Sequence, residues 1–385
     1  MKSLEDIAGI DSVRTPCYVY DMELLDRTLN AMRSAASKHG ICVNYALKAN
    51  CEDEILQKIA SCGIGADCVS GNEVLRAYGC GFAKTGIFFA GVGKSDREIV
   101  RALDCGAPYF IVESLQELEV LNSIASQRGT DVNVLLRINP EVDAHTHKFI
   151  TTGTLINKFG IAMNDLEAAL ELLNRLPRIK MQGLHSHIGS QINRMDVFAL
   201  QCEKMNMLVK RVLAAGFDCH LVGLGGGLGV DYEEPDQNPV PDFESWFSTI
   251  DASLERTPGM KVFVEPGRSL VAQCGILLSR VLFVKHNPAC NFMILDAGMN
   301  DLVRPALYGV SHKIENLSAL KREPEGFEQY EIVGPVCESS DVFAHDCRLP
   351  VAKRGDMVAI RSAGAYGATM SSRYNLKDLA ETLYV

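Results

Sequence analysis

The sequence is poor in several features that mark particular classes of protein. It has one tryptophan in 385 residues, and 38 basic residues face 48 acidic ones, for a net charge of −10. Proteins that bind nucleic acids usually carry a basic face, so we expect no nucleic-acid partner. No apolar run approaches the ~18 residues of a membrane span, and the first residues lack the apolar core of a signal peptide. We therefore expect no membrane partner.

The cysteines lack the spacing of a disulfide framework or a zinc site. There are thirteen, an odd number, and none forms a C-x-x-C pair. This pattern predicts a cytoplasmic protein whose thiols are mostly buried and unreactive. Hydrophobic residues at 47% and charged residues at 22% are ordinary for a globular chain. The length suggests about two domains.

Short apolar runs alternate with longer amphipathic stretches between residues 40 and 265, which predicts successive β-α units. Eight parallel strands with helices between them favour a closed (β/α)₈ barrel of the TIM type, and an open doubly wound sheet is the alternative. The candidate strands are Val43–Leu47, Ala66–Val69, Ile87–Ala90, Tyr109–Val112, Val132–Ile138, Met181–His187, His220–Leu224 and Val262–Val264.

After residue 268 the pattern changes to alternating runs punctuated by Gly, Pro and Asn. This predicts a C-terminal, mostly β domain built as a sandwich or barrel. We expect the early run Pro16–Tyr20 to pair with it. The expected domains are therefore a barrel over 22–267 and a β domain formed by 1–21 and 268–385.

Polar residues fall where the barrel strands end, which is where barrels of this type place their active sites. They include Lys48, which closes the apolar run Tyr45-Ala-Leu-Lys48. A buried lysine is costly unless it is paired or chemically used. Lys48 is thus either an ion-pair partner or a Schiff-base amine whose pKa is lowered by desolvation. The other strand-end residues are Asp67, Gly91, Glu113, Arg137, His185, His187, Gly225–Gly227 and Glu265.

Two glycine-rich segments raise the question of phosphate binding. Leu224-Gly-Gly-Gly-Leu-Gly229 follows the seventh strand, where a barrel commonly holds a phosphate, although a plain turn has the same composition. Gly91-Val-Gly-Lys-Ser95 resembles the end of a nucleotide-binding P-loop. Phe88 stands where the first glycine of that motif belongs, so we reject the nucleotide hypothesis.

Two further motifs each allow two interpretations. Glu265-Pro-Gly-Arg268 is either a turn with a local salt bridge, or an acid that holds a ring nitrogen protonated beside a base that binds an anion. His185-Ser-His187 places two imidazoles on one face of a strand, as in some metal sites. The turn Ile188-Gly-Ser190 suits a phosphate or ring contact better, so we predict no metal.

Taken in chain order, these residues resemble the fold-type III pyridoxal-phosphate decarboxylases, most of all the branch that acts on diaminopimelate. The resemblance extends from Thr15 to Asn375. The matching segments are Tyr45-Ala-Leu-Lys-Ala-Asn50, His185-Ser-His-Ile-Gly-Ser-Gln191, Glu265-Pro-Gly-Arg268, Arg304-Pro-Ala-Leu-Tyr308, Gly334-Pro-Val-Cys-Glu-Ser339 and Gly364-Ala-Tyr366.

The resemblance implies a cofactor, pyridoxal 5′-phosphate, and a homodimer with active sites at the subunit interface. It implies that Lys48 forms the Schiff base, that His187 stacks on the cofactor ring, and that Glu265 pairs with the pyridine nitrogen. Ser190 and the glycine amides would contact the phosphate. The full set of implied cofactor residues is Lys48, His187, Ser190, Gly225, Gly226, Gly227, Glu265, Pro266, Gly267, Arg268 and Tyr366.

The implied reaction is decarboxylation of meso-2,6-diaminopimelate to L-lysine and CO₂, the last step of lysine biosynthesis. Cys337, supplied by the partner subunit, would donate the proton, and Glu338 would bind the distal ammonium. The implied substrate residues are Arg268, Arg304, Tyr308, Glu338 and Tyr366. Alternatives are decarboxylation of D-lysine, D-ornithine or a carboxylated polyamine, or a catalytically silent binding protein on the same scaffold.

Overall fold

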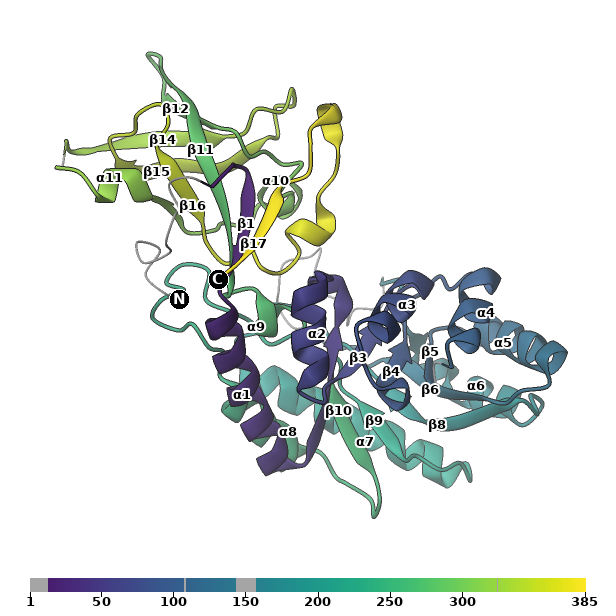
Figure 1. The fold of residues 1–385 in the computed structure, drawn as a ribbon. Helices are drawn as coiled ribbons and strands as arrows, with labels where there is room; N and C mark the ends of the chain where they lie inside the picture. The colour runs from purple at the N-terminus through teal and green to yellow at the C-terminus, as the bar shows by residue number, and fades with distance from the viewer. Residues whose placement is uncertain (1–12, 107–108, 143–156, 324) are drawn as a thin grey trace. The chain divides into compact units, whose positions relative to one another are not determined.

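The computed structural model describes residues 13–106, 109–142, 157–323 and 325–385. Contacts divide the chain into two units (Figure 1). We call Leu29–Gly229 with Asp242–Gly267 the barrel unit, and the described residues up to Thr28, with Val230–Pro241 and Arg268–Val385, the β unit. The first twelve residues, which carry the expectation about a signal peptide and part of the predicted segment 1–21, lie outside the described residues.

The barrel unit contains a closed ring of eight parallel strands, in the order β5-β4-β3-β2-β10-β9-β8-β6, which closes because β6 pairs with β5. The short strand β7 (Ile161–Ala162) pairs with the end of β6. The predicted barrel is confirmed, and the open doubly wound sheet is wrong. The ring strands are β2 Ile41–Ala46, β3 Gly65–Cys68, β4 Ile87–Phe89, β5 Tyr109–Val112, β6 Val132–Asn139, β8 Ile179–His185, β9 Leu221–Gly223 and β10 Lys261–Val264.

Helices connect the barrel strands, and three of them begin with the same local motif. Ser70, Ser95 and Ser114 are N-caps whose side chains each accept a hydrogen bond from the backbone N–H of a glutamate three residues later. Such caps satisfy the free N–H groups of the first turn. They therefore define where the chain turns from strand to helix. The helices are α1 Met22–His39, α2 Asp53–Ser61, α3 Gly71–Gly79, α4 Asp96–Asp104, α5 Leu115–Arg128, α6 Leu166–Leu173, α7 Met195–Ala214 and α8 Phe243–Ser253.

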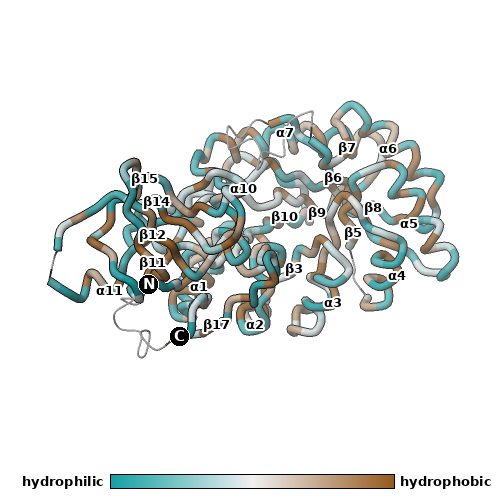
Figure 2. Tube along the Cα trace, turned by 90° about the horizontal axis from the view of Figure 1, so that it is seen from above, coloured by the Kyte–Doolittle hydropathy of each residue, from teal (hydrophilic) through white to brown (hydrophobic). Residues whose placement is uncertain are grey.

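Aromatic and aliphatic side chains fill the barrel interior. The ring of Phe88 lies 4.7 Å from the rings of both Tyr109 and Phe263, and Ile111 and Leu135 belong to the same buried cluster. Hydrophilic and hydrophobic residues are interspersed along the helices that surround the barrel (Figure 2). Because the interior is packed with apolar groups, polar side chains are left to the ends of the strands.

The β unit is built on an eight-stranded sheet, so the predicted mostly β domain is confirmed. Strand β1 pairs antiparallel with β11 and parallel with β17, which confirms that the early run joins this sheet. The remaining path is β13-β16-β11-β12-β14-β15. The elements are β1 Cys17–Tyr20, α9 Arg268–Val271, β11 Gly275–His286, β12 Asn291–Leu295, α10 Arg304–Tyr308, β13 Ile314–Asn316, α11 Leu317–Leu320, β14 Phe327–Val333, β15 Val342–Pro350, β16 Met357–Ile360 and β17 Glu381–Tyr384.

Segment 230–241 groups with the β unit although it lies between barrel elements in the sequence. The side chain of Gln273 donates to the Asp231 carbonyl at 2.8 Å, and Lys313 pairs with Glu234 at 3.0 Å. These long-range polar contacts attach the segment to residues that follow the barrel. Among the described residues, no helix is long and apolar enough to cross a membrane.

Candidate active site

Charged side chains meet at the C-terminal ends of the barrel strands. Lys48 lies in the one-turn helix Leu47–Ala49 that follows β2, and its Nζ is 3.6 Å from Oδ2 of Asp67 in β3. The Lys48 side chain is 42% exposed, so the expectation of a buried, desolvated lysine is wrong. Because β2 ends at Ala46, the amine projects from the end of the barrel and lies beside the buried Asp67 carboxylate.

Glu265 and His185 form a buried pair two strands apart in the ring. His185, the last residue of β8, donates from Nε2 to Oε2 of Glu265, which follows β10, at 2.8 Å. Burial alone would raise the pKa of Glu265, but His185, Lys48 and Arg137 together hold it below its usual value. The second carboxylate oxygen, Oε1, is buried and has no hydrogen-bond partner among the described residues. An ionised carboxylate with one oxygen to spare is suited to bind a protonated ring nitrogen.

The sequence placed His185 at a strand end and made it a possible metal ligand, but it did not predict the pairing of His185 with Glu265. Its position at a strand end was visible, but its partner depends on the strand order. Strands β8 and β10 both flank β9, which brings their ends close together. Among the described residues, no group of three His, Cys, Asp or Glu side chains could hold a metal.

Asp67 occupies the same buried end of the barrel. Burial and, to a smaller extent, the charge of Glu265 raise its pKa to about 7, although the charge of Lys48 opposes the shift. Its Oδ1 atom has no hydrogen-bond partner in the part of the chain that the structure describes. Asp67 therefore holds or releases a proton near neutral pH, beside the Lys48 amine.

His187 lies against the glycine loop that follows β9. The Gly226 N–H donates to Nδ1 of His187 at 3.2 Å, so the proton of the neutral ring is on Nε2. Burial lowers the pKa of His187 well below its usual value, and the charges of Lys48 and Arg137 lower it further. His187 is therefore a neutral, flat ring that suits stacking on another ring.

The glycine loop approaches its neighbours so closely that no side chain fits there. A Cβ at Gly225 would lie 2.5 Å from His187 Nδ1, one at Gly226 would lie 2.3 Å from the Glu265 carbonyl oxygen, and one at Gly227 would lie 2.7 Å from the Gly189 carbonyl oxygen. The Ile192 N–H donates to the Gly227 carbonyl at 2.8 Å, which joins this loop to the one that contains Ser190. The two loops together form a backbone cradle of the kind that binds phosphate.

Lys94 of the rejected P-loop motif has a structural role. Its side chain is 1% exposed, and it forms an ion pair with Glu117 at 2.6 Å. It also donates to the Gly91 and Ile111 carbonyl oxygens at 2.8 and 2.7 Å. With all three donors engaged, Lys94 has none left for a phosphate.

A second group of site residues lies within the β unit. Arg268 and Arg304 are both buried, and both guanidinium groups lie near the ring of Tyr232, at 5.9 and 4.7 Å from its centre. Arg268 donates to the Tyr232 hydroxyl at 2.6 Å and lies 4.8 Å from the ring of Tyr366. Two buried guanidinium groups around one tyrosine are suited to bind an anion.

The buried guanidinium of Arg304 has a donor that is not hydrogen-bonded among the described residues. Burial lowers its pKa, neighbouring tyrosines oppose that shift, and the charge of Arg268 adds to it. Its Nε–H has no acceptor among the described residues. Tyr232 was missed by the sequence analysis because segment 230–241 was assigned to the barrel. Tyr308, at the end of α10, is half-buried.

Cys337 and Glu338 are exposed in the loop between β14 and β15. The Cys337 N–H donates to Asn375 Oδ1 at 2.8 Å, which ties this loop to the C-terminal segment. Among the described residues, Glu338 forms no ion pair with Arg304. A single chain therefore leaves these two side chains open to solvent.

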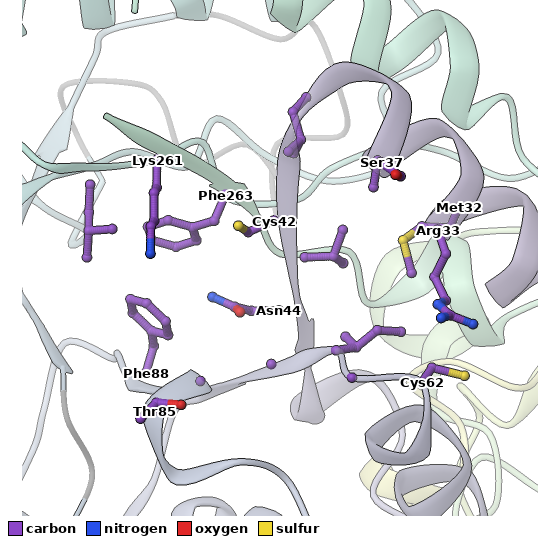
Figure 3. A pocket seen from close by; sticks show the side chains of 18 of the residues that line it. Met32, Arg33, Ser37, Cys42, Asn44, Cys62, Thr85, Phe88, Lys261 and Phe263 are labelled. Atoms are coloured by element: carbon purple, nitrogen blue, oxygen red, sulfur yellow. The ribbon is translucent and has the colours of Figure 1, made fainter. Parts of the chain in front are cut away.

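A cavity of about 500 Å³ lies at the opposite end of the barrel from Lys48 and Glu265. It is lined by residues at the N-terminal ends of the strands, among them Ile41, Gly65 and Lys261. Figure 3 shows Asn44, Phe88 and Phe263 around one part of it. The lining residues that the structure describes include none of the strand-end acids and histidines, so this cavity is separate from the group of residues described above.

Comparison with known proteins decides the family. Residues 23–272 match the family described as "Pyridoxal-dependent decarboxylase, pyridoxal binding domain". The chain belongs to the pyridoxal-dependent decarboxylases. The resemblance inferred from the motifs is thereby confirmed, and the cofactor of this decarboxylase is pyridoxal 5′-phosphate.

Individual relatives cover nearly all of the decarboxylase chain. It is 45% identical over 380 residues to the diaminopimelate decarboxylase of Bacteroides thetaiotaomicron, covering 98% of this chain and 97% of the relative. It is 41% identical to that of Zymomonas mobilis, covering 96% and 87%. The crystal structure of the diaminopimelate decarboxylase of Helicobacter pylori, complexed with L-lysine, has a TM-score of 0.89 at 36% identity and covers 97% of this chain and 92% of that one.

The residues at the barrel end fit the cofactor of this decarboxylase. The unpaired Oε1 of Glu265 matches a protonated pyridine nitrogen, and the glycine cradle matches a phosphate. The neutral His187 ring matches a stacking partner, and the exposed Lys48 amine matches a group that bonds covalently to an aldehyde.

Proposed function

We propose that this chain is a carboxy-lyase that converts meso-2,6-diaminopimelate to L-lysine and CO₂, the last step of lysine biosynthesis. The observation that carries the proposal is the pair of buried guanidinium groups around Tyr232. A substrate that loses one carboxylate and keeps a second needs a cationic pocket for the one it keeps. The relatives named above as diaminopimelate decarboxylases support this substrate.

At the barrel end, we propose that the described residues hold the cofactor as follows. Lys48 supplies the amine that binds it covalently, His187 stacks on its ring, and Ser190 with the glycine loop binds its phosphate. Pro266 and Gly267, which follow Glu265 in the chain, are the remaining residues that we propose to contact the cofactor. When bound, the protonated pyridine ring accepts the electron pair left on the α-carbon as CO₂ departs. Glu265, which His185 keeps ionised, stabilises the ring proton.

The β unit supplies the groups that recognise the substrate. We propose that Arg268, Arg304 and Tyr308 bind the distal carboxylate, with Tyr366 beside them, and that Glu338 binds the distal ammonium. A site with buried arginines binds poorly any amino acid that lacks the distal carboxylate, because the guanidinium groups then stay desolvated and unpaired. This argues against D-lysine and D-ornithine as the preferred substrates.

Cys337 is proposed to donate the proton that replaces CO₂ at the α-carbon, in the active site of a partner subunit. Its exposure in one chain supports this, as does the neighbouring segment, where Leu376 is 94% exposed and Tyr374 and Leu379 are exposed as well. A second copy of the chain would cover these apolar groups. We therefore propose a homodimer with shared active sites.

Mixing two inactive variants tests the shared site. Lys48→Ala and Cys337→Ala should each be inactive, and subunit exchange should regenerate activity in the hybrid. Fluorescent labels on the two variants confirm that exchange has occurred. Exchange without recovery of activity would contradict the shared site.

A substrate panel tests the reaction itself. Purified protein with pyridoxal phosphate should release CO₂ and L-lysine from meso-diaminopimelate faster than it releases CO₂ from D-lysine, D-ornithine or a carboxylated polyamine. A faster rate with one of these would replace the proposed substrate. No release from any of them, together with cofactor binding, would favour a silent binding protein.

Two broader proposals complete this description. All thirteen cysteines are free thiols, which supports a reducing compartment, the cytoplasm. The expected division of labour, with residues 22–267 binding the cofactor and residues 1–21 and 268–385 completing the active site, stays a prediction.

A further inference from the structure

His312 lies directly behind Arg304 in the β unit, and two hydrogen bonds define its state. Its Nε2 is 2.8 Å from Nη1 of Arg304, and its Nδ1 is 2.8 Å from the Arg361 carbonyl oxygen. A guanidinium can only donate and a carbonyl can only accept. Nε2 is therefore the acceptor and Nδ1 carries the proton, which means that the ring is neutral.

The ring is held firmly in this position. Arg361 forms ion pairs with Glu315 and Asp236 and donates its own N–H to the Lys313 carbonyl. The His312 ring also meets the ring of Tyr232 edge-on, with 5.0 Å between centroids. Its anchors thus include the same tyrosine on which Arg304 lies.

The electrostatics of the site keep the His312 ring neutral near neutral pH. Burial and, to a smaller extent, the charge of Arg304 lower its pKa to about 3. A charged imidazolium would turn a donor toward the guanidinium and repel it. The neutral ring offers Arg304 an acceptor without adding a negative charge that would neutralise it.

We propose that His312 is a positioning residue that orients Arg304 toward the distal carboxylate of the substrate. It engages one N–H on Nη1, while the Nε–H, which has no acceptor among the described residues, stays available to a ligand. A carboxylate partner in place of His312 would satisfy Arg304 internally. This inference rests on the proposed function and adds a specificity determinant to it.

Three substitutions separate the two hydrogen bonds of the ring. His312→Phe keeps a ring and removes both bonds. His312→Asn places an amide N–H near the Arg361 carbonyl but is too short to reach Arg304. His312→Gln reaches Arg304 with its amide oxygen. His345→Gln, on the exposed surface of the same unit, is the matched control.

The measured quantities are kcat and KM for meso-diaminopimelate and the inhibition constants of L-lysine and 1,5-diaminopentane. L-lysine keeps the distal carboxylate, and the diamine has no carboxylate. We expect His312→Phe and His312→Asn to raise KM and the inhibition constant of L-lysine about tenfold, the effect of one hydrogen bond to a charged group. We expect kcat to change less than about threefold and the inhibition constant of the diamine to stay unchanged. His312→Gln should recover most of the loss.

Several outcomes would overturn the inference. Equal weakening of L-lysine and the diamine would show a general structural effect, and unchanged KM in all three variants would show that Arg304 needs no positioning. Both results can be obtained only if the wild-type enzyme releases CO₂ from meso-diaminopimelate. They would therefore refute the role of His312 and leave the proposed function intact. A wild-type enzyme that releases none refutes the proposed function and this inference with it. Cofactor absorbance confirms that each variant is loaded, and far-UV circular dichroism confirms that each variant, including its β unit, is folded.

Discussion

Replacing His185 by phenylalanine removes the partner that keeps Glu265 ionised inside the barrel. The two side chains are 2% and 6% exposed, and their contact is 2.8 Å long. Removing one member of such a buried pair costs about 3–5 kcal/mol of unfolding free energy, because the remaining charge stays desolvated. We expect a loss of this size at pH 8.

The loss of unfolding free energy in His185→Phe should shrink as the pH falls, because the pKa of Glu265 is lowered in the wild type and raised in the variant. In the wild type the pKa of Glu265 lies below its usual 4.5, so the pair contributes stability above that value and loses it at lower pH. In the variant burial dominates and the pKa rises. The carboxyl then takes up a proton as the pH falls through the raised pKa. At pH 5.5, one unit above the usual value, about 1.4 kcal/mol of the penalty remains.

The single tryptophan allows the free energy of unfolding to be measured for the barrel unit alone. Trp246 in α8 is fully buried and packs on Phe198 and Phe247, so its fluorescence reports unfolding of the barrel unit. Urea unfolding of wild type and His185→Phe at pH 8 and pH 5.5 gives the two differences in free energy. Adding Glu265→Gln to the variant should abolish the pH dependence. A loss of equal size at both pH values in the single variant would refute the electrostatic explanation.

Three further predictions concern the cofactor cradle, the rejected P-loop and the proton donor. Gly226→Ala brings a Cβ to 2.3 Å from a backbone carbonyl oxygen, so cofactor affinity in an absorbance titration should fall more than about tenfold. Gly79→Ala, on a helix with no atom within 4 Å, should leave that affinity unchanged. Lys94→Met leaves Glu117 without its ion-pair partner, so it should lower the free energy of unfolding in urea by about 3 kcal/mol while leaving cofactor affinity intact. Lost affinity in a folded variant would restore the hypothesis that Lys94 binds a phosphate. Cys337→Ser should lower kcat at least about tenfold with little change in KM, because a hydroxyl is a weaker acid than a thiol, and an unchanged kcat would exclude it as the proton donor.

The barrel and the identity of its strand-end residues follow from local pattern. Alternating apolar runs and amphipathic stretches define the β-α units, and Ser-x-x-Glu caps mark the starts of three helices. Because all strands of such a barrel run parallel, their last residues lie at one end. Lys48, Asp67 and Glu265 could therefore be placed together from the sequence before any contact was known.

The contacts between these residues depended on the tertiary structure. The partner of Glu265 is set by the order of strands in the ring, which no local window of sequence contains. The exposure of Lys48 depends on where β2 ends. The structural role of Lys94 depends on its ion pair with Glu117, which lies in the helix after the next strand.

The two arginines proposed to bind the distal carboxylate show the same dependence on local and tertiary structure most clearly. The motifs alone identified Arg268 and Arg304 as candidates, because their neighbours along the chain matched a known pattern. Tyr232 and His312, which surround them, come from a segment between barrel elements and from a loop before β13. Local sequence determines which element a residue joins and which way its strand runs. Tertiary packing decides which distant side chain pairs with a buried charged group. Only the folded chain removes both groups from water and brings them within hydrogen-bond distance.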